Sequence, residues 1–504
     1  MTGRVRKAAP LGIALDPAAA APLHRQIGEQ IRRGILERRL APGLKLPSSR
    51  LMAAELHCAR GTVLAALDQL VAEGYLVAQP GSGLSVAANL PDEMLVSPSV
   101  GSPPDAPAAR PPVLSRRAIG TLADETLDAE LNESPIAFPT GQPDRTAFPF
   151  PLWAKLLERE WRQPAWSVAG ALHPFGHHGL RSAIADYLGV ARGFSCNPDA
   201  VVVTSGVRQS LSLFARLVLD AGEEAWIEEP SFVGTREALA LAEVNAVAVP
   251  VDASGFSLDA AIKLAPDARL AVVAPSHQFP LGVVLGLQRR LALLSWAERA
   301  NGWIAEDDFD GEYRYAGRPL APLRALDRTG RVAYLGSFSK LLFPALRLSY
   351  VVLPDSLVPA AEKSMSGGAV RASMLGQGAL ARFIADGHLA THLRRTRLLY
   401  ADRQQALIAS AGRHLEGVLQ VAPDPGGMHL IARPHPDLAP HFKDRAATAA
   451  AAAASLTVSP LSACYRDEPR AQGLILGYAA TPEDAIEPAI MRLADVLRER
   501  HKKR

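Results

Sequence analysis

Lys340 lies in a segment whose residue types suit covalent chemistry. It ends the run Gly336-Ser337-Phe338-Ser339-Lys340, which follows an apolar stretch, and Arg347 stands seven residues further on. A lysine amine forms an imine with an aldehyde, and a cation together with hydroxyl groups can hold a phosphate. This combination favours a site for pyridoxal phosphate, a cofactor that carries both an aldehyde and a phosphate.

The other parts of such a site have candidates elsewhere in the chain. A carboxylate must keep the pyridine nitrogen protonated, because the positively charged ring is the electron sink, and Asp307 at the end of WIAED can reach that nitrogen. The segment Ser205-Gly206-Val207-Arg208 joins a strand pattern to a helical one, so free N–H groups at that helix start can hold phosphate. Phe232 can stack on the ring face. Each candidate is weak by itself, whereas their order and spacing together carry the prediction.

The residues around these candidates predict the fold that must position them. From residue 136 onward, short apolar runs bounded by Gly, Pro or Ser alternate with helical patterns. Such runs are typical of a mainly parallel sheet covered on both faces. They read AVVVTSG, EEAWIEEP, LAVVAPS, GWIAEDDF, VAYLGSFS and LSYVVLP. We therefore expect an α/β domain over residues 136–504, in which the alanine run 446–454 forms a helix of a smaller C-terminal α+β subdomain.

The first 88 residues have a different pattern. Apolar residues recur every fourth position from Leu23 to Ile35, which is one stripe of a helix. Ser48 can cap a short second helix that contains Arg50, and a third helix begins after Cys58-Ala59. The segment YLVAQPGSGLSVAA then reads as two strands around a glycine turn. Three helices followed by a hairpin predict a winged helix-turn-helix over residues 1–88.

Basic residues in this region favour double-stranded DNA as its partner. Residues 1–90 hold eleven Lys and Arg against six Asp and Glu, a net charge of +5 in a chain whose total is +3. A recognition helix offers donors where it enters the major groove, and here that end is Arg60-Gly61-Thr62. Arg50 is placed for the DNA backbone, and the wing tip Gly81-Ser82-Gly83 can bind phosphate through main-chain N–H groups.

Composition excludes several other classes of protein. The chain has 504 residues, of which 48% are hydrophobic and 21% charged, so disorder over its whole length is excluded. No stretch is apolar enough for a membrane span or a signal peptide, and three scattered cysteines suit the reducing cytoplasm. Prolines crowd between residues 89 and 135, which predicts a semi-stiff linker between the two domains.

The two domains each resemble a known family. Residues 22–87 resemble the GntR-type winged helix in the stretch LPSSRLMAAELHCARGTVLAALDQLVAEGYLVAQPGSG. The remainder resembles fold-type I aminotransferases, and the whole chain is similar to the MocR-type subfamily of GntR regulators, in which the two are fused. The matching stretches there are VVVTSGVRQSLSLFARLVLD, PSHQFPLGVVL, WIAEDDFDGEYRYAGRPL and YLGSFSKLLFPALRLSYVVLP. The resemblance implies that Lys340 forms the cofactor aldimine, that Asp307 meets the pyridine nitrogen, and that Ser337, Ser339 and Arg347 hold the phosphate.

Several residues depart from the pattern of true aminotransferases. Phe309 and Phe232 stand where tyrosines are common, and Arg208 stands where glutamine is frequent. Ile475 occupies the place of the arginine that usually grips a substrate carboxylate, so an amino-acid substrate loses a positioning contact. The run His173 to His178 suggests a metal site, but no third ligand group is evident. We expect no metal, and expect these histidines at the cofactor or effector pocket or at a subunit contact.

Three functions remain open. The first is a homodimeric DNA-binding regulator that reads two half-sites and senses pyridoxal phosphate, an amine or an amino acid through an internal aldimine at Lys340. The second is a working aminotransferase with an accessory DNA-binding domain, against which Ile475 and Phe309 weigh. The third is a DNA-binding protein whose aminotransferase fold only dimerises, against which the presence of Lys340, Asp307 and Arg347 weighs.

Overall fold

The computed structural model describes residues 12–16, 19, 21–79, 83–88, 137–162, 173–317, 320–367 and 371–502. These residues belong to two compact units, Met1–Pro112 and Val113–Arg504. Gly81 and the expected linker 89–135 lie outside the described residues. Within the described ranges, no helix is long and apolar enough to cross a membrane.

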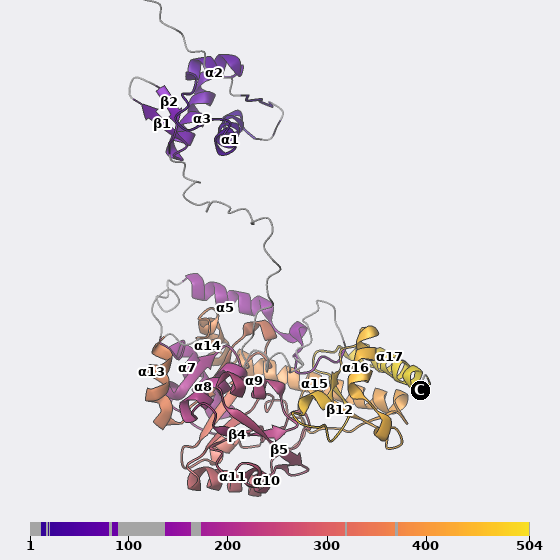
Figure 1. Cartoon of the computed structure of the whole chain (residues 1–504). Helices are drawn as coiled ribbons and strands as arrows, with labels where there is room; N and C mark the ends of the chain where they lie inside the picture. The colour runs from indigo at the N-terminus through magenta and orange to yellow at the C-terminus, as the bar shows by residue number, and fades with distance from the viewer. Residues whose placement is uncertain are drawn as a thin grey trace, which may run out of the picture. The chain divides into compact units, whose positions relative to one another are not determined.

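The N-terminal unit is a winged helix-turn-helix, as the sequence predicts (Figure 1, indigo). Its elements are α1 (Leu23–Leu36), α2 (Ser49–Glu55), α3 (Arg60–Ala72), β1 (Leu76–Gln79) and β2 (Gly83–Val86), the last two paired antiparallel. Ser48 caps α2 by accepting a hydrogen bond from the Leu51 N–H at 3.3 Å. Ile27, Ile31 and Ile35 of α1 are buried in one core with Leu67 and Leu70 of α3, so the predicted stripe is the face that holds the domain together.

An eight-stranded mixed sheet forms the centre of the second unit. Its order is β3-β10-β9-β8-β7-β4-β5-β6, with β4, β5, β7, β8 and β9 parallel and with β10 antiparallel to β3 and β9. The strands are β3 (Val201–Thr204), β4 (Glu224–Glu229), β5 (Asn245–Asp252), β6 (Gly255–Phe256), β7 (Leu270–Val273), β8 (Trp303–Asp307), β9 (Val332–Ser337) and β10 (Ser349–Val352). Six of these strands lie in the six predicted runs, and β5 and β6 were not predicted.

Alternate residues of these strands are buried on opposite sides of the sheet, because helices cover both of its faces. Trp226 and Ile304 belong to a core with Trp296 of α11, whereas Ile227 and Ala305 belong to a second core with Phe214 of α8. Figure 1 labels the helices of this unit. They are α5 (Phe150–Arg162), α7 (His178–Ala191), α8 (Val207–Val218), α9 (Val233–Leu241), α10 (Leu258–Leu264), α11 (Leu287–Arg299), α12 (Leu323–Leu326), α13 (Val358–Ser366) and α14 (Gln377–Ala385).

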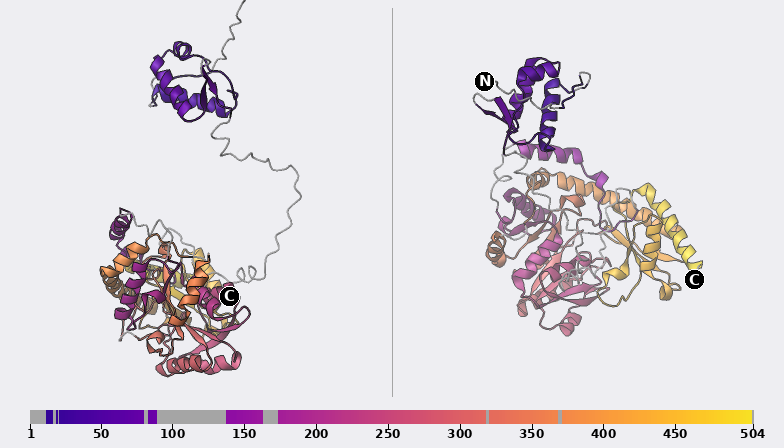
Figure 2. Two further views of the ribbon diagram at one scale, coloured as in Figure 1. Left: turned by 90° about the vertical axis from the view of Figure 1, so that its left-hand side faces the viewer. Right: turned by 45° about the horizontal axis from the view of Figure 1, so that its top comes forward.

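A smaller C-terminal lobe lies beside the large sheet (Figures 1 and 2, orange to yellow). The long helix α15 (His388–His414) leads into it, α16 (Asp444–Ala453) packs on its sheet, and α17 (Glu483–Lys502) packs against α15 and α16. That antiparallel sheet has the order β11-β12-β14-β13, with β11 (Leu419–Val421), β12 (His429–Pro434), β13 (Ser459–Pro460) and β14 (Leu474–Gly477). The alanine run therefore forms a helix of a C-terminal subdomain, as predicted.

Candidate functional site

A cavity lies at the carboxyl edge of the large sheet. It encloses about 950 Å³, counting the open solvent at its mouth. The strands β4, β7 and β8 end at this edge, where open α/β sheets bind their ligands. Its walls are formed by Thr140, Gly141, Val207, Glu228, Ser231, Phe232, Thr235, Val272, Val273, Ala274, Phe279, Asp307, Phe309, Lys340, Met428 and His429. The structure thus brings together Lys340, Asp307, Phe232 and Val207 from the sequence prediction.

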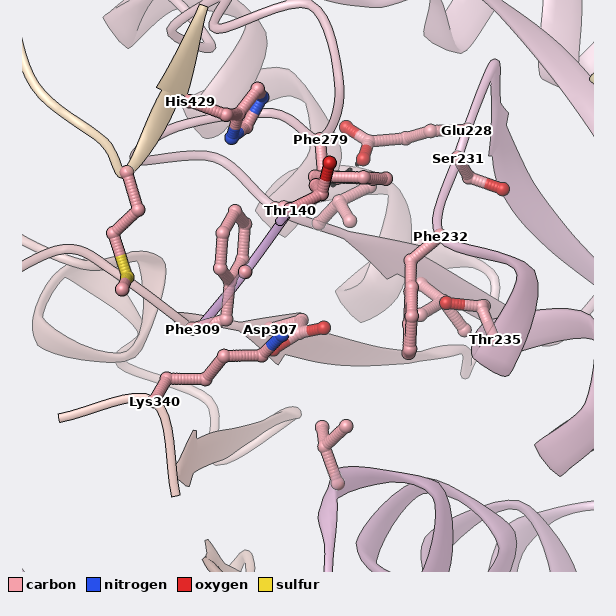
Figure 3. A pocket seen from close by; sticks show the side chains of 16 residues that line it. Thr140, Glu228, Ser231, Phe232, Thr235, Phe279, Asp307, Phe309, Lys340 and His429 are labelled. Atoms are coloured by element: carbon pink, nitrogen blue, oxygen red, sulfur yellow. Dashed lines mark hydrogen bonds between the residues drawn. The ribbon is translucent and has the colours of Figure 1, made fainter. Parts of the chain in front are cut away.

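Lys340 reaches this cavity from the turn after β9, and its amine approaches the backbone of Gly141 (Figure 3). A Cβ atom built on Gly141 would lie 2.5 Å from Nζ of Lys340, closer than any real Cβ contact. Gly141 also has φ +67°, a left-handed conformation that glycine adopts without strain. The backbone conformation favours glycine at this position, and a side chain here would also displace the end of the flexible Lys340 side chain.

The Oδ1 atom of Asp307 is buried and has no hydrogen-bond partner among the described residues. Asp308 and Asp310 each have one oxygen paired, because Asp308 bonds to Arg192 and Asp310 Oδ2 lies 3.0 Å from His277 Nδ1, while their Oδ1 atoms also lack a hydrogen-bond partner among the described residues. Burial, together with the charge of Asp308, raises the pKa of Asp307 from 3.8 to about 7. A buried carboxyl oxygen without a partner can accept a hydrogen bond from a cationic donor, and a protonated ring nitrogen is such a donor. The residues present therefore fit a pyridine cofactor.

The residues that are expected to bind the phosphate of the cofactor lie between the end of β3 and the start of α8. Gly206 precedes the first turn of α8, whose leading N–H groups have no partner within the helix. Nη2 of Arg347 lies 3.8 Å from a Cβ built on Gly206, so the guanidinium stands beside this helix start. Arg347 has φ +49°, a conformation that costs a residue with a side chain about 1–3 kcal/mol and is concentrated at functional sites. Ser337 and Ser339 are half-buried at the end of β9, and the Ser349 hydroxyl donates to Ser337 Oγ at 3.3 Å.

Phe232 lines the cavity, whereas Arg208 lies on its outer side. The Arg208 guanidinium is 5.5 Å from the centre of the Phe232 ring, and its Nε lies 2.9 Å from Glu237 Oε2. The carboxylate of Glu237 therefore offsets the positive charge of Arg208, which the sequence interpretation placed near the cofactor phosphate.

The cavity contains polar residues that the sequence analysis did not identify. Glu228 at the end of β4 accepts a hydrogen bond from the Ala274 N–H at 3.2 Å, and burial raises its pKa to about 8. His429 at the start of β12 bonds through Nε2 to the Pro280 carbonyl at 3.0 Å, and burial lowers its pKa to about 4. Their positions in the chain carry no motif that could have found them.

Two of the departures from the aminotransferase pattern, Phe309 and Ile475, differ in position. Phe309 lines the cavity and packs near Phe279, with ring centres 6.1 Å apart. Ile475 is fully buried in β14, opposite Ile431 of β12. Residues that face each other in an antiparallel pair point to the same side of the sheet, so Ile475 shares its face with Ile431 and His429.

The histidine run is used for local structure at the start of α7. His177 caps α7 by accepting a hydrogen bond from the Leu180 N–H, and His173 Nε2 lies 3.3 Å from Glu362. The residues found on the cavity wall include none of these histidines. Across the described part of the chain, no cluster of three or more His, Cys, Asp or Glu side chains could hold a metal ion.

The expected DNA-reading groups lie at the start of α3. Arg60 is its first residue, is exposed, and donates from Nε to Ser49 Oγ at 3.3 Å. A Cβ on Gly61 would meet nothing within 4 Å, so this surface is open to close approach. Thr62 is half-buried in the same turn, and Arg50 is exposed on α2.

The wing adds one cation that the sequence analysis missed. Gly83 begins β2 with φ +89°, and the Lys45 side chain packs 3.6 Å from where its Cβ would stand. Lys45 also pairs with Ser85 through a backbone bridge. A lysine side chain therefore lies beside Gly83, where the turn of the wing meets β2.

Comparisons with known proteins match both units. Residues 23–86 match the family described as bacterial regulatory proteins, gntR family, and residues 136–493 match aminotransferase class I and II. The chain is 40% identical over 480 residues to the probable rhizopine catabolism regulatory protein MocR of Rhizobium meliloti, covering 95% of this chain and 94% of that one. It is 33% identical to the HTH-type pyridoxine biosynthesis transcriptional regulator PdxR of Corynebacterium glutamicum, covering 97% and 99%.

Solved aminotransferases share the fold of the second unit. LysN, the α-aminoadipate aminotransferase of Thermus thermophilus complexed with N-(5'-phosphopyridoxyl)-L-leucine, matches with a TM-score of 0.69 and 25% identity, over 78% of this chain and 98% of that one. The kynurenine aminotransferase of Pyrococcus horikoshii, in complex with PMP, matches with a TM-score of 0.66 and 25% identity, over 76% and 94%. Both of these aminotransferases were solved with a pyridoxal-type group bound.

Proposed function

The chain belongs to the MocR-type subfamily of GntR transcription regulators, and from this we propose that it couples operator binding to pyridoxal phosphate chemistry at Lys340. Residues 1–88 bind DNA in this proposal, residues 89–135 link the domains, and residues 136–504 bind the cofactor and sense the effector. One observation carries the cofactor part: Lys340 and an Asp307 without a partner for Oδ1 line the same cavity.

Different residues of the cavity hold different parts of the cofactor. Lys340 supplies the amine that binds it covalently, and Asp307 accepts the hydrogen bond of the ring nitrogen. Phe232 covers one ring face, while Arg347 and the N–H groups after Gly206 receive the phosphate. When bound, pyridoxal phosphate supplies an aldehyde carbon that captures amines reversibly.

An amine or amino-acid effector reports its presence by taking the place of Lys340. The effector nitrogen forms the new bond to the aldehyde carbon, and Lys340 Nζ leaves as a free amine. Because this amine lies against Gly141, its release changes contacts at residues 140–141. Pyridoxal phosphate itself is a second effector under this scheme, because its binding forms the Lys340 link. Either event shifts the balance between two states of the regulator only if it favours one of them.

We also propose a homodimer in the cytoplasm. MocR-type and aminotransferase relatives support a dimer in which two winged domains read two half-sites. Sedimentation analysis should give twice the mass of the 53.6 kDa chain, and a monomer at micromolar concentration contradicts this part. The cysteines Cys58, Cys196 and Cys464 are free thiols in the structure, in keeping with a reducing compartment.

The test is a visible absorbance spectrum of the purified protein with pyridoxal phosphate. We expect a coloured protein whose band is lost on borohydride reduction, and a peptide labelled at Lys340. Lys340→Ala should lose the label, whereas Lys363→Ala, which removes an exposed lysine of α13, should keep it. Amines that shift the band should also change operator affinity in a gel-shift titration. A wild-type protein that stays colourless with added cofactor refutes the sensor function.

A further inference from the structure

The part of the cavity wall away from Lys340 carries polar side chains without a net charge. His429 Nε2 lies 3.0 Å from the Pro280 carbonyl, which can only accept, so Nε2 carries the proton. Burial lowers the pKa of this imidazole to about 4, so the ring is neutral at pH 7 and its Nδ1 atom is left as an acceptor. Figure 3 shows this imidazole on the cavity wall, with Glu228 and Ser231 on the neighbouring side.

The described wall of the cavity offers little positive charge. Of the described residues that line it, Lys340 is the one cationic side chain. Arg208 pairs with Glu237 outside the wall, and Arg347 stands at the phosphate end beside Gly206. Burial raises the pKa of Glu228 to about 8 and lowers that of His429 to about 4, so both groups are neutral at pH 7.

The sheet of the C-terminal lobe places Ile475 on the same face as His429. His429 pairs with Gly477 and Ile431 pairs with Ile475, so all four residues share one face. A Cβ built on Gly477 would lie 2.9 Å from the Cα of Thr140, another residue of the cavity. The face that presents His429 is therefore the one turned toward the cavity, and a buried isoleucine stands on it.

We propose that the effector is a primary amine whose far end carries an uncharged hydroxyl group rather than a carboxylate, and that His429 selects it. The effector hydroxyl donates to His429 Nδ1, and its carbon chain packs on Phe279, Phe309 and Met428. A carboxylate in the same place meets an acceptor, and loses its hydration without gaining a cation there. This proposal rests on the proposed sensing function. The exchange at Lys340 breaks one carbon–nitrogen bond, forms another and leaves Nζ as an amine, so it needs no oxidant.

Matched pairs of amines test this preference on the full-length protein loaded with pyridoxal phosphate. The probes are 4-aminobutan-1-ol against 4-aminobutanoate and 3-aminopropan-1-ol against 3-aminopropanoate, which differ only in the terminal group. The apparent Kd is read from the shift of the visible band, and gel shifts with operator DNA give a second readout. We expect each alcohol to bind about tenfold or more tightly than its acid, because the acid leaves a buried charge unpaired.

Three variants separate the residues involved. His429→Phe keeps a ring but removes the acceptor, and should abolish the preference, whereas His429→Asn retains an acceptor near the position of Nδ1 and should retain it. Ile475→Arg adds a cation to the same face and should reverse the preference. The proposal is overturned if the wild-type protein binds the acids as tightly as the alcohols or more tightly, or responds to neither probe. It is also overturned if the His429→Phe variant keeps the preference for the alcohols. The absence of a visible band and of a borohydride-trapped label would instead refute the sensing function itself.

Discussion

Replacing Asp307 by asparagine should stabilise the cofactor-free protein while it weakens cofactor binding. The pKa of Asp307 is raised to about 7 in the folded protein from an ordinary value of 3.8, so the native state binds more protons than the unfolded state between these values. Stability therefore falls as the pH rises through this window, and the full loss is present above pH 7. Asparagine does not titrate, so the variant lacks this loss.

The size of the effect follows from the two pKa values. Between about pH 5 and about pH 8, the wild-type apoprotein should lose about 2–3 kcal/mol of unfolding free energy more than Asp307→Asn. Any cost of burying the amide itself is the same at both pH values and cancels from this difference. Bound pyridoxal phosphate should remove the loss, because the ring N–H pairs with the carboxylate.

The assay is urea unfolding of the apoproteins at both pH values, followed by absorbance titration with pyridoxal phosphate. Asp386→Asn, which removes an exposed carboxylate after α14, should follow the wild type in both measurements. We expect Asp307→Asn to bind the cofactor more weakly and to respond less to amines. A stability difference that is the same at both pH values, or an unchanged amine response, would show that Asp307 is not the ring-nitrogen partner.

Three further predictions concern DNA binding, the lysine pocket and turnover. Arg60→Ala should reduce operator preference by about 1–3 kcal/mol. Arg50→Ala should lower the affinity for all DNA sequences and make the salt slope of binding smaller by about one. Gel shifts at two salt concentrations measure both effects, and unchanged DNA binding in both variants contradicts the assignment of these residues. Gly141→Ala should weaken pyridoxal phosphate binding about tenfold or more, because its Cβ would meet the lysine amine. Gly189→Ala, where a Cβ meets nothing within 4 Å, is the control, and equal binding by the two variants refutes the clash. Transaminase turnover should be slow or absent with Ile475 in place, so vigorous turnover of an ordinary amino-acid and keto-acid pair in a coupled assay would favour a working aminotransferase.

Local sequence patterns were sufficient to predict most of the helices and strands, and the site residues that directly follow strands. The turn after β9 and the start of α8 are short, and the types and spacing of their residues are enough to indicate Lys340 and Gly206. The stripe of α1 was equally clear, because a helix that buries one face repeats its apolar residues every three to four positions. The strands β5 and β6 were missed, since β5 is half-buried along most of its length and lacks a continuous apolar run.

The sequence by itself determined the winged helix-turn-helix and the aminotransferase-like fold. It was also enough to predict a cofactor site, because a lysine after a buried strand and a glycine at a helix start are local features. The tertiary structure alone decided which distant residues complete the cavity: Thr140, Glu228 and His429 meet there from segments that no local period connects. It also decided their protonation, because the raised pKa of Glu228 and the lowered pKa of His429 come from burial. Burial depends on how the two sheets pack around the cavity, and that packing is a property of the whole fold.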